Sequence, residues 1–338
     1  VREKAIPVSG DTGMKILRDI VLTGQFKNNV VAGKIEQRND VLAKQIEYDL
    51  QYVDLAKIKP FKIVVDPANA MGAQYIEALF GELPCQLIKI NFFLDGTFPA
   101  HEADPLKEKN LIQIKERVIK EKADLGIAID GDGDRVFFID NKGKTIDQSI
   151  IRGVLAMIFL RDKPGAKIAY DIRPGRITRD LILANGGIPT VTKVGHSLIK
   201  EQAIKEGAYF AGESSGHFFL NMAIGCFEVP VIVILKLLEE FSQSQKTVAE
   251  YIKPYQKYFY SGEINFTVSD KEAVFAMIEK KYSDGQINKL DGVTIEYTNF
   301  WFNVRASNTE SKMRLNLEAT TKEIMEEKVK ELTEMIKS

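Results

Sequence analysis

The sequence contains few of the residues on which several protein classes depend. Of its 338 residues only two are cysteines, three are histidines and one is tryptophan. Cys85 and Cys226 are too few for a disulfide framework or a structural zinc site, and they favour a reducing, cytoplasmic location. Lys and Arg number 46 against 47 Asp and Glu, so charge gives no reason to expect nucleic acid or an anionic membrane as a partner. The longest apolar run, residues 229–238, contains Pro230 and Lys236 and is too short to span a membrane.

What remains is the composition of a globular protein. Hydrophobic residues make up 45% and charged residues 28%, which excludes wholesale disorder, collagen and coiled coil. The length exceeds that of one ordinary hydrophobic core and predicts two or three domains. The chain begins at Val1 rather than Met and carries no signal-peptide pattern, so we expect a processed or trimmed chain, or one cut from something longer.

The order of predicted strands and helices repeats along the chain. Lys62 and Asp66, which bound the first apolar strand, precede the matching Lys167 and Asp171 by 105 residues. Each copy continues as helix, strand, helix and strand, with the other strands predicted at 87–93, 125–129, 190–194 and 209–211. This pattern predicts two related α/β domains with mixed sheets, at residues 42–144 and 145–252. Their functional loops should follow the carboxyl ends of the strands.

The two ends of the chain follow different patterns. Residues 1–41 are charged and broken up, and residues 28–43 are interpreted as a connector. Residues 253–338 contain four strand candidates and a terminal helical pattern, which predicts a small α+β domain.

An acidic loop carries the strongest chemical signal. Asp130, Asp132 and Asp134 alternate with glycines after an apolar strand. Carboxylates near 5 Å apart repel by roughly 3 kcal/mol per pair at a dielectric of about 20, which protonation or a cation would relieve. Hard oxygen ligands in a glycine-rich turn suit Mg²⁺, although a solvated acidic turn is the alternative. A calcium EF-hand is excluded because Arg135 stands at its glycine position and Asn141 at its glutamate position.

Two further loops have polar groups suited to a sugar phosphate. Residues 212–217 read Gly-Glu-Ser-Ser-Gly-His and offer carboxylate, hydroxyl and imidazole groups for a hydroxyl-rich ligand. Residues 305–310 read Arg-Ala-Ser-Asn-Thr-Glu, and their donors suit a dianionic phosphate. Taken singly, the histidines could equally be structural and the arginine turn an ordinary turn.

Together, these three loops resemble the α-D-phosphohexomutase family, specifically its phosphomannomutase/phosphoglucomutase branch. The resemblance runs through nearly the whole chain and includes Pro-Val-Ser-Gly-Asp-Thr-Gly at 7–13, Gly-Thr-Phe-Pro at 96–99 and Val-Gly-His-Ser-Leu-Ile-Lys at 194–200. It implies four domains around one cleft: three related α/β domains and a smaller phosphate-binding domain.

The resemblance also implies roles for individual residues. Mg²⁺ would be held by Asp130, Asp132 and Asp134, with Arg135 beside them and His217 as a candidate for proton transfer. The residues implied to contact substrate are Arg173, Gly195, His196, Glu213, Ser215, Arg305, Ser307, Asn308 and Thr309. The implied reaction interconverts hexose 1-phosphate and hexose 6-phosphate through a phosphoserine and a hexose 1,6-bisphosphate, in a monomer or weak homo-oligomer.

One departure from the family bears on activity. The serine loop, which typically reads Thr-Ala-Ser-His-Asn-Pro, is absent from this sequence. Residues 1–41 would then be the remnant of a truncated first domain, poorly packed or paired with another chain, and the chain alone is predicted to be inactive. Phosphoglucosamine mutase and a non-catalytic sugar-phosphate binding module are the alternative functions.

Overall fold

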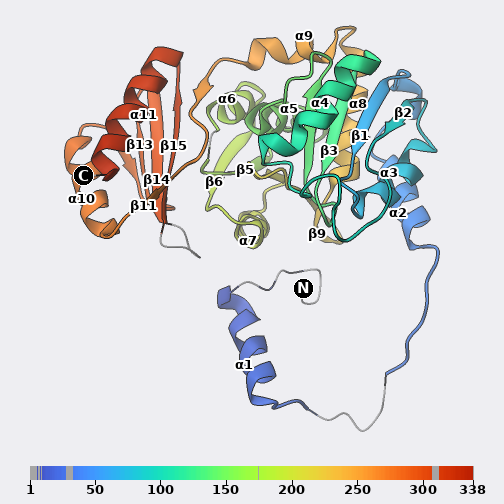
Figure 1. Ribbon diagram of the computed structural model, residues 1–338, viewed down its shortest axis with the longest axis horizontal. Helices are drawn as coiled ribbons and strands as arrows, with labels where there is room; N and C mark the ends of the chain where they lie inside the picture. The colour runs from blue at the N-terminus through green and yellow to red at the C-terminus, as the bar shows by residue number, and fades with distance from the viewer. Residues whose placement is uncertain are drawn as a thin grey trace.

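The computed structural model describes residues 6, 8, 10–27, 33–173, 175–306 and 312–337. Three β-sheets with their covering helices lie side by side in one row (Figure 1). We call them the first α/β domain, the second α/β domain and the C-terminal domain. Among the described residues, no helix has both the length and the hydropathy needed to cross a bilayer.

The first α/β domain contains a mixed sheet with strand order β2-β1-β3-β4. Strand β1 is parallel to β2 and β3, and β4 returns antiparallel to β3. The central strands are buried on both faces, as expected for parallel strands covered by helices. The bounds are α2 Val41–Leu50, β1 Lys62–Asp66, α3 Gly72–Phe80, β2 Gln86–Lys89, α4 Ile112–Glu121, β3 Leu125–Ile129 and β4 Val136–Asp140.

The second α/β domain repeats this topology and adds one strand. Its sheet has the order β6-β5-β7-β8-β9, with the same strand directions over the first four strands. The predicted repeat is therefore confirmed. The bounds are α5 Gln148–Asp162, β5 Lys167–Asp171, α6 Arg176–Ala184, β6 Ile188–Thr192, α7 His196–Glu206, β7 Phe210–Gly212, β8 Phe218–Met222, β9 Gly225–Glu228, α8 Pro230–Gln243 and α9 Val248–Ile252.

The C-terminal domain is an antiparallel sheet with helices packed on it and a hydrophobic core of its own. The strand order is β10-β15-β14-β13-β12, and β11 pairs with the other half of β15. The predicted α+β class is confirmed. The bounds are β10 Phe259–Tyr260, β11 Ile264–Thr267, α10 Lys271–Lys281, β12 Gln286–Asn288, β13 Val293–Glu296, β14 Phe300–Ala306, β15 Lys312–Ala319 and α11 Lys322–Lys337.

Some predicted boundaries were wrong. The connector expected at residues 28–43 overlaps α2, which begins at Val41. The strand expected at 87–93 ends at Lys89, and Asn91 then adopts a left-handed backbone with φ 54° that turns the chain away. The strand expected at 190–194 lies at Ile188–Thr192.

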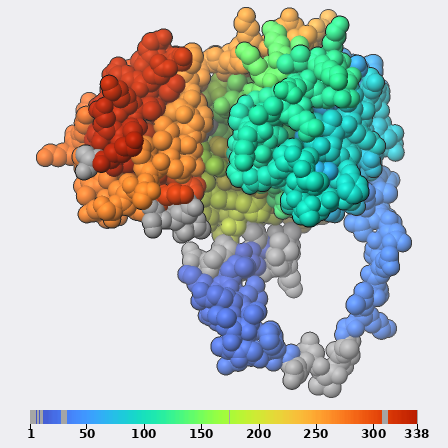
Figure 2. All heavy atoms as spheres, in the orientation of Figure 1, coloured from blue at the N-terminus to red at the C-terminus, as the bar shows by residue number. Residues whose placement is uncertain are grey.

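The described part of the N-terminal segment packs little on these three domains, although Thr12 Oγ1 donates to Glu201 of α7 at 3.3 Å. Every residue of α1 (Lys15–Thr23) is exposed or half-buried, including apolar Ile16, Leu17 and Leu22. Figure 2 shows this blue helix below the body of the molecule. Within residues 1–41, the described helix α1 therefore has no buried residue.

Asp49 makes the stability of the first α/β domain depend on pH. Burial at the end of α2 raises the pKa of Asp49 to about 6, above the ordinary 3.8, although Gln45 donates to it. The folded state therefore holds this proton more tightly than the unfolded state, and stability falls as the pH rises from about 4 to about 6. We expect Asp49→Asn to raise the free energy of unfolding by about 1–3 kcal/mol at pH 8 and to change it little at pH 4.

Urea unfolding at the two pH values measures this difference. Glu47→Gln, on the solvent face of the same helix, is the matched control and should behave like the wild type at both. An equal gain for Asp49→Asn at pH 4 and pH 8 would contradict the assignment.

Candidate active site

The acidic loop between β3 and β4 is organised around Asp130. This side chain is 2% exposed, and its Oδ1 accepts the backbone N–H groups of Gly133 (3.2 Å) and Arg135 (3.1 Å). Gly133 has φ 85°, and a Cβ there would lie 2.9 Å from the ring of Tyr75. Glycine is therefore needed for the loop to close in this way.

The three aspartates of this loop converge. One carboxylate oxygen of each lies within 4.8 Å of the others. Burial, helped by the charge of Asp134, raises the pKa of Asp130 despite the neighbouring Arg135. A bound divalent cation would offset the unfavourable energy of burying these negative charges close together. Because all the donors are oxygens on a tight turn, the set fits a hard ion such as Mg²⁺.

Arg135 is fixed beside the acidic loop by two carboxylates. Its Nε donates to Asp130 Oδ2 at 2.6 Å, and its Nη1 donates to Asp104 Oδ1 at 3.2 Å. The two ion pairs hold the guanidinium at the mouth of the loop, with 21% of the side chain exposed.

A single β-bridge joins the acidic loop to the second α/β domain. Arg135 pairs with His217, and the N–H of Val136 donates to the carbonyl of Gly216 at 3.2 Å. A Cβ on Gly216 would lie 2.6 Å from the Phe137 ring, so glycine permits this close approach. The loops predicted to hold metal and sugar are thus adjacent.

His217 lies between two carboxylates. Its Nε2 is 3.3 Å from Asp134 Oδ1, and its Nδ1 is 3.1 Å from Glu213 Oε2 and 2.8 Å from Ser215 Oγ. Burial alone would lower the pKa of His217, but the hydrogen bonds that its ring donates to Asp134 and Glu213 outweigh it and raise the pKa to about 9. The ring is therefore charged at neutral pH.

Glu213 accepts hydrogen bonds from two other predicted site residues of the second α/β domain. Its Oε1 accepts the N–H of Gly195 and Nη2 of Arg173, each at 3.0 Å. Arg173 also donates to Asp171, which is fully buried and pairs with Arg152 at 2.7 Å. Burial would raise the pKa of Asp171, but the two arginines lower it to about 2.

His196 completes this cluster from the first residue of α7. Its ring centroid lies 4.9 Å from that of His217. Nε2 of His196 is 2.6 Å from Oε1 of Glu228, which is also 3.3 Å from Nζ of Lys200 through its other oxygen. The hydrogen bond with His196 and the charge of Lys200 hold the pKa of Glu228 at about 2 in spite of burial.

Arg305 lies near the end of β14 in the C-terminal domain. It is 4% exposed and donates to Glu263 Oε2 at 2.9 Å. Gly292 packs directly on this strand, since a Cβ there would lie 2.3 Å from the carbonyl oxygen of Val304. Ser307, Asn308 and Thr309 lie outside the described residues.

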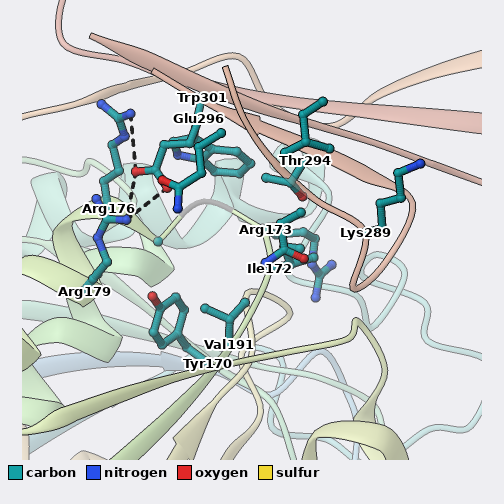
Figure 3. A pocket seen from close by; sticks show the side chains of 14 residues that line it. Tyr170, Ile172, Arg173, Arg176, Arg179, Val191, Lys289, Thr294, Glu296 and Trp301 are labelled. Carbon is teal, nitrogen blue, oxygen red and sulfur yellow. Dashed lines mark hydrogen bonds and ion pairs between the residues drawn. The ribbon is translucent and has the colours of Figure 1, made fainter. Parts of the chain in front are cut away.

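The second α/β domain and the C-terminal domain enclose a cavity of about 420 Å³. Arg173, Arg176 and Trp301 are among its lining residues (Figure 3). Arg173 also helps Arg305 to hold the pKa of Glu263 below its ordinary range against the effect of burial. Ion pairs therefore connect Asp134 through His217 and Glu213 to Arg173, and a separate ion pair joins Glu263 to Arg305.

All three domains match known family models. Residues 42–143 match "Phosphoglucomutase/phosphomannomutase, alpha/beta/alpha domain II", residues 147–258 match domain III and residues 263–335 match the C-terminal domain. The chain belongs to the phosphoglucomutase/phosphomannomutase family. The predicted family is confirmed.

Similar proteins agree with this assignment. A phosphomannomutase of Methanocaldococcus jannaschii is 37% identical over 99% of this chain and 74% of its own length, and one of Vibrio cholerae is 35% identical over 100% and 74%. A solved phosphoglucomutase/phosphomannomutase family protein of Burkholderia thailandensis superposes with a TM-score of 0.86 at 27% identity. That structure covers 98% of this chain, which spans 70% of it.

Several polar residues of this family member's site were not predicted, among them Asp171 and Glu263. Asp104 reaches Arg135 from 31 positions earlier, and Glu228 reaches His196 from 32 positions later. Asp104 lies only a few residues after the motif at 96–99. That motif indicated that the region belongs to the site, but it did not identify Asp104 itself.

Proposed function

We propose that the protein is a phosphohexomutase that interconverts the 1- and 6-phosphates of mannose or glucose. The observation that supports this is the series of ion pairs from the acidic loop to Arg173, together with the Glu263–Arg305 pair of the C-terminal domain. The phosphomannomutases among the relatives favour this reaction over that of phosphoglucosamine mutase. We expect a cytoplasmic protein, in keeping with its two free cysteines, that acts as a monomer or weak homo-oligomer.

Mg²⁺ is the proposed cofactor, held by Asp130, Asp132 and Asp134. A fungal N-acetylphosphoglucosamine mutase with the same fold, 14% identical with a TM-score of 0.62, was solved with GlcNAc-6P and magnesium. Bound at this loop, the ion would neutralise charge on the transferring phosphoryl group.

The remaining steps belong to side chains of the chain itself. Glu213 and Ser215 are placed to bind sugar hydroxyls, while Arg305 and Arg173 bind the phosphate that does not react. During transfer, the P–O bond of the family's phosphoserine breaks as a P–O bond to the sugar oxygen forms, and the proton that the sugar hydroxyl loses replaces the one that His217 gives to the departing oxygen. Nε2 of His217 is protonated at neutral pH and is suited to donate that proton to the departing oxygen. Arg135 adds positive charge beside the acidic loop.

Ligand titration tests the binding part of this proposal. In Mg²⁺ buffer, the chain should bind glucose 1-phosphate, and Arg305→Ala should weaken the affinity at least about ten-fold because it removes a charge-assisted phosphate contact. Arg161→Ala, which removes a 54% exposed arginine paired with Glu240, is the matched control and should bind normally. Equal affinities for Arg305→Ala and the wild type would overturn the phosphate site.

Turnover tests the catalytic part. The chain alone should not convert mannose 1-phosphate to mannose 6-phosphate, because its sequence has no phosphoserine loop to supply the phosphoryl group. ³¹P NMR follows both esters, and the Methanocaldococcus jannaschii phosphomannomutase serves as the positive control. Conversion by the chain itself would show that a group other than the family's phosphoserine donates the phosphoryl group.

A further inference from the structure

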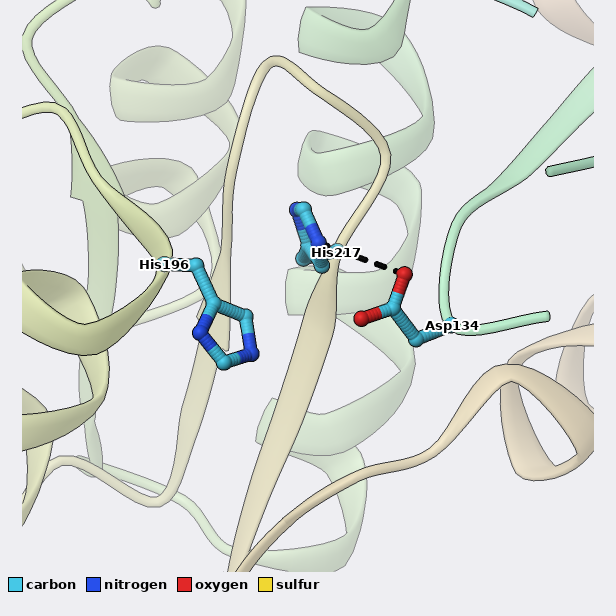
Figure 4. Close-up of side chains that lie close together, drawn as sticks. All are labelled: Asp134, His196 and His217. Carbon is cyan, nitrogen blue, oxygen red and sulfur yellow. Dashed lines mark ion pairs between the residues drawn. The ribbon is translucent and has the colours of Figure 1, made fainter. Parts of the chain in front are cut away.

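Three potential metal ligands from different elements meet next to the acidic loop. Asp134 belongs to that loop, His196 begins α7, and His217 precedes β8. Each offers one ligand atom, and these atoms all lie within 4.8 Å of one another. In Figure 4 the Asp134 carboxylate lies beside the His217 ring, and the His196 ring borders the same space.

The donor types separate this cluster from the all-oxygen loop. Two imidazole nitrogens and one carboxylate suit Zn²⁺ and similar transition metals, whereas Mg²⁺ prefers oxygen ligands. With metal–ligand bonds of about 2.0–2.2 Å, tetrahedral ligands lie about 3.3–3.5 Å apart. His217 Nε2 and Asp134 Oδ1 are 3.3 Å apart already, so only His196 needs to move closer.

The surroundings favour a cation with an open position. Nδ1 of His217 is held by Glu213 at 3.1 Å, an arrangement that fixes the ring of many metal-bound histidines and leaves Nε2 for the metal. Glu228, 2.6 Å from Nε2 of His196, adds negative charge and would release that nitrogen when a metal binds. The side chains of His196 and Asp134 are 40% and 29% exposed, so an ion and a bound water can enter.

We infer that Asp134, His196 and His217 form a transition-metal site suited to Zn²⁺, distinct from the Mg²⁺ loop but sharing Asp134 with it. Zinc bound there uses the lone pair of His217 Nε2 and draws Asp134 away from Asp130 and Asp132. Occupation therefore weakens Mg²⁺ binding, because the two ions compete for Asp134, so zinc inhibits. The inhibition rests on the proposed function, whereas zinc binding does not.

Calorimetric titration with ZnCl₂, with Mg²⁺ present, tests the site. We expect one tightly bound Zn²⁺ per chain, and His196→Ala and His217→Ala should each weaken it at least about ten-fold. Asp132→Asn should lower Mg²⁺ affinity and change zinc affinity less than about three-fold. Co²⁺ used as a spectroscopic probe should give visible absorption that the two histidine variants lose.

The chain supplies its own controls. His101→Ala removes the only other histidine and should bind zinc like the wild type. His196→Asn, at an accessible position, replaces any alanine variant whose thermal unfolding shows that it has not folded. The inference is overturned if no zinc binds, if the His196 and His217 variants bind normally, or if Asp132→Asn abolishes both metals together. Titration with glucose 1-phosphate in Mg²⁺ alone tests the proposed function separately.

Discussion

Replacing Asp171 by asparagine is expected to lower the free energy of unfolding by about 3–5 kcal/mol, because it leaves buried positive charge uncompensated. Asp171 is fully buried and accepts hydrogen bonds from Arg152, Arg173 and Ser214. Arg152 is 1% exposed, so water cannot replace the lost carboxylate. Urea unfolding measures the change.

The same substitution should also weaken sugar-phosphate binding. Asp171 fixes Arg173, which lines the cavity and in turn holds Glu213, so the loss of the carboxylate releases both groups. In titrations with glucose 1-phosphate, folded Asp171→Asn protein should therefore bind more weakly than the wild type.

The repeat provides a matched control at Asp66, which occupies the equivalent end of β1. Asp66 is 1% exposed and accepts from the backbone of Ala68, from Asn91 and from His101, but it balances no buried arginine. Asp66→Asn keeps an oxygen acceptor and should cost only about 1–2 kcal/mol. If the two variants lose equal stability, the arginine charges are not what makes Asp171 important.

The sequence was sufficient to predict the parts that depend on local pattern. Strands β1, β3 and β5 are continuous apolar runs, each ended by an aspartate, and their spacing revealed the repeat. The loops after them follow from the rule that ligands gather at carboxyl strand ends. The family resemblance then supplied roles that residue types alone left open.

Other elements could not be predicted, because tertiary contacts decide them. Helix α5 was not predicted: it is buried on nearly every side between domains, so its sequence lacks a clear polar face. Strands β8 and β9 form a short hairpin, and the residues at one end of each strand are only half-buried. The Asp104–Arg135 and His196–Glu228 pairs join residues from different loops, so only the fold brings them together.

Arg176 is the clearest example of a contact that the sequence could not predict, because its side chain joins the second α/β domain to the C-terminal domain. Its guanidinium is buried and donates to the backbone carbonyls of Thr298 (2.9 Å), Phe300 (3.0 Å) and Tyr297, while its N–H donates to Glu318. Arg176→Ala removes this donor from all three carbonyls, of which that of Phe300 is buried. We expect docking of the C-terminal domain to weaken by about 3 kcal/mol.

The single tryptophan reports this interface directly. Trp301 lines the cavity, and its Nε1 donates to Glu318 Oε2 at 2.7 Å, the same oxygen that accepts the N–H of Arg176. In urea, the Trp301 fluorescence change of Arg176→Ala should come at a lower concentration than in the wild type and ahead of the loss of far-ultraviolet circular dichroism.

Arg179→Ala provides the comparison on the same helix. Arg179 is 38% exposed and pairs with Glu296 at 2.8 Å, so its loss should cost less than about 1 kcal/mol. A fluorescence transition of Arg176→Ala that coincides with that of Arg179→Ala would show that the carbonyl contacts do not hold the domains together. An early transition in Arg176→Ala alone would assign the docking energy to one buried side chain, which also borders the cavity next to Arg173.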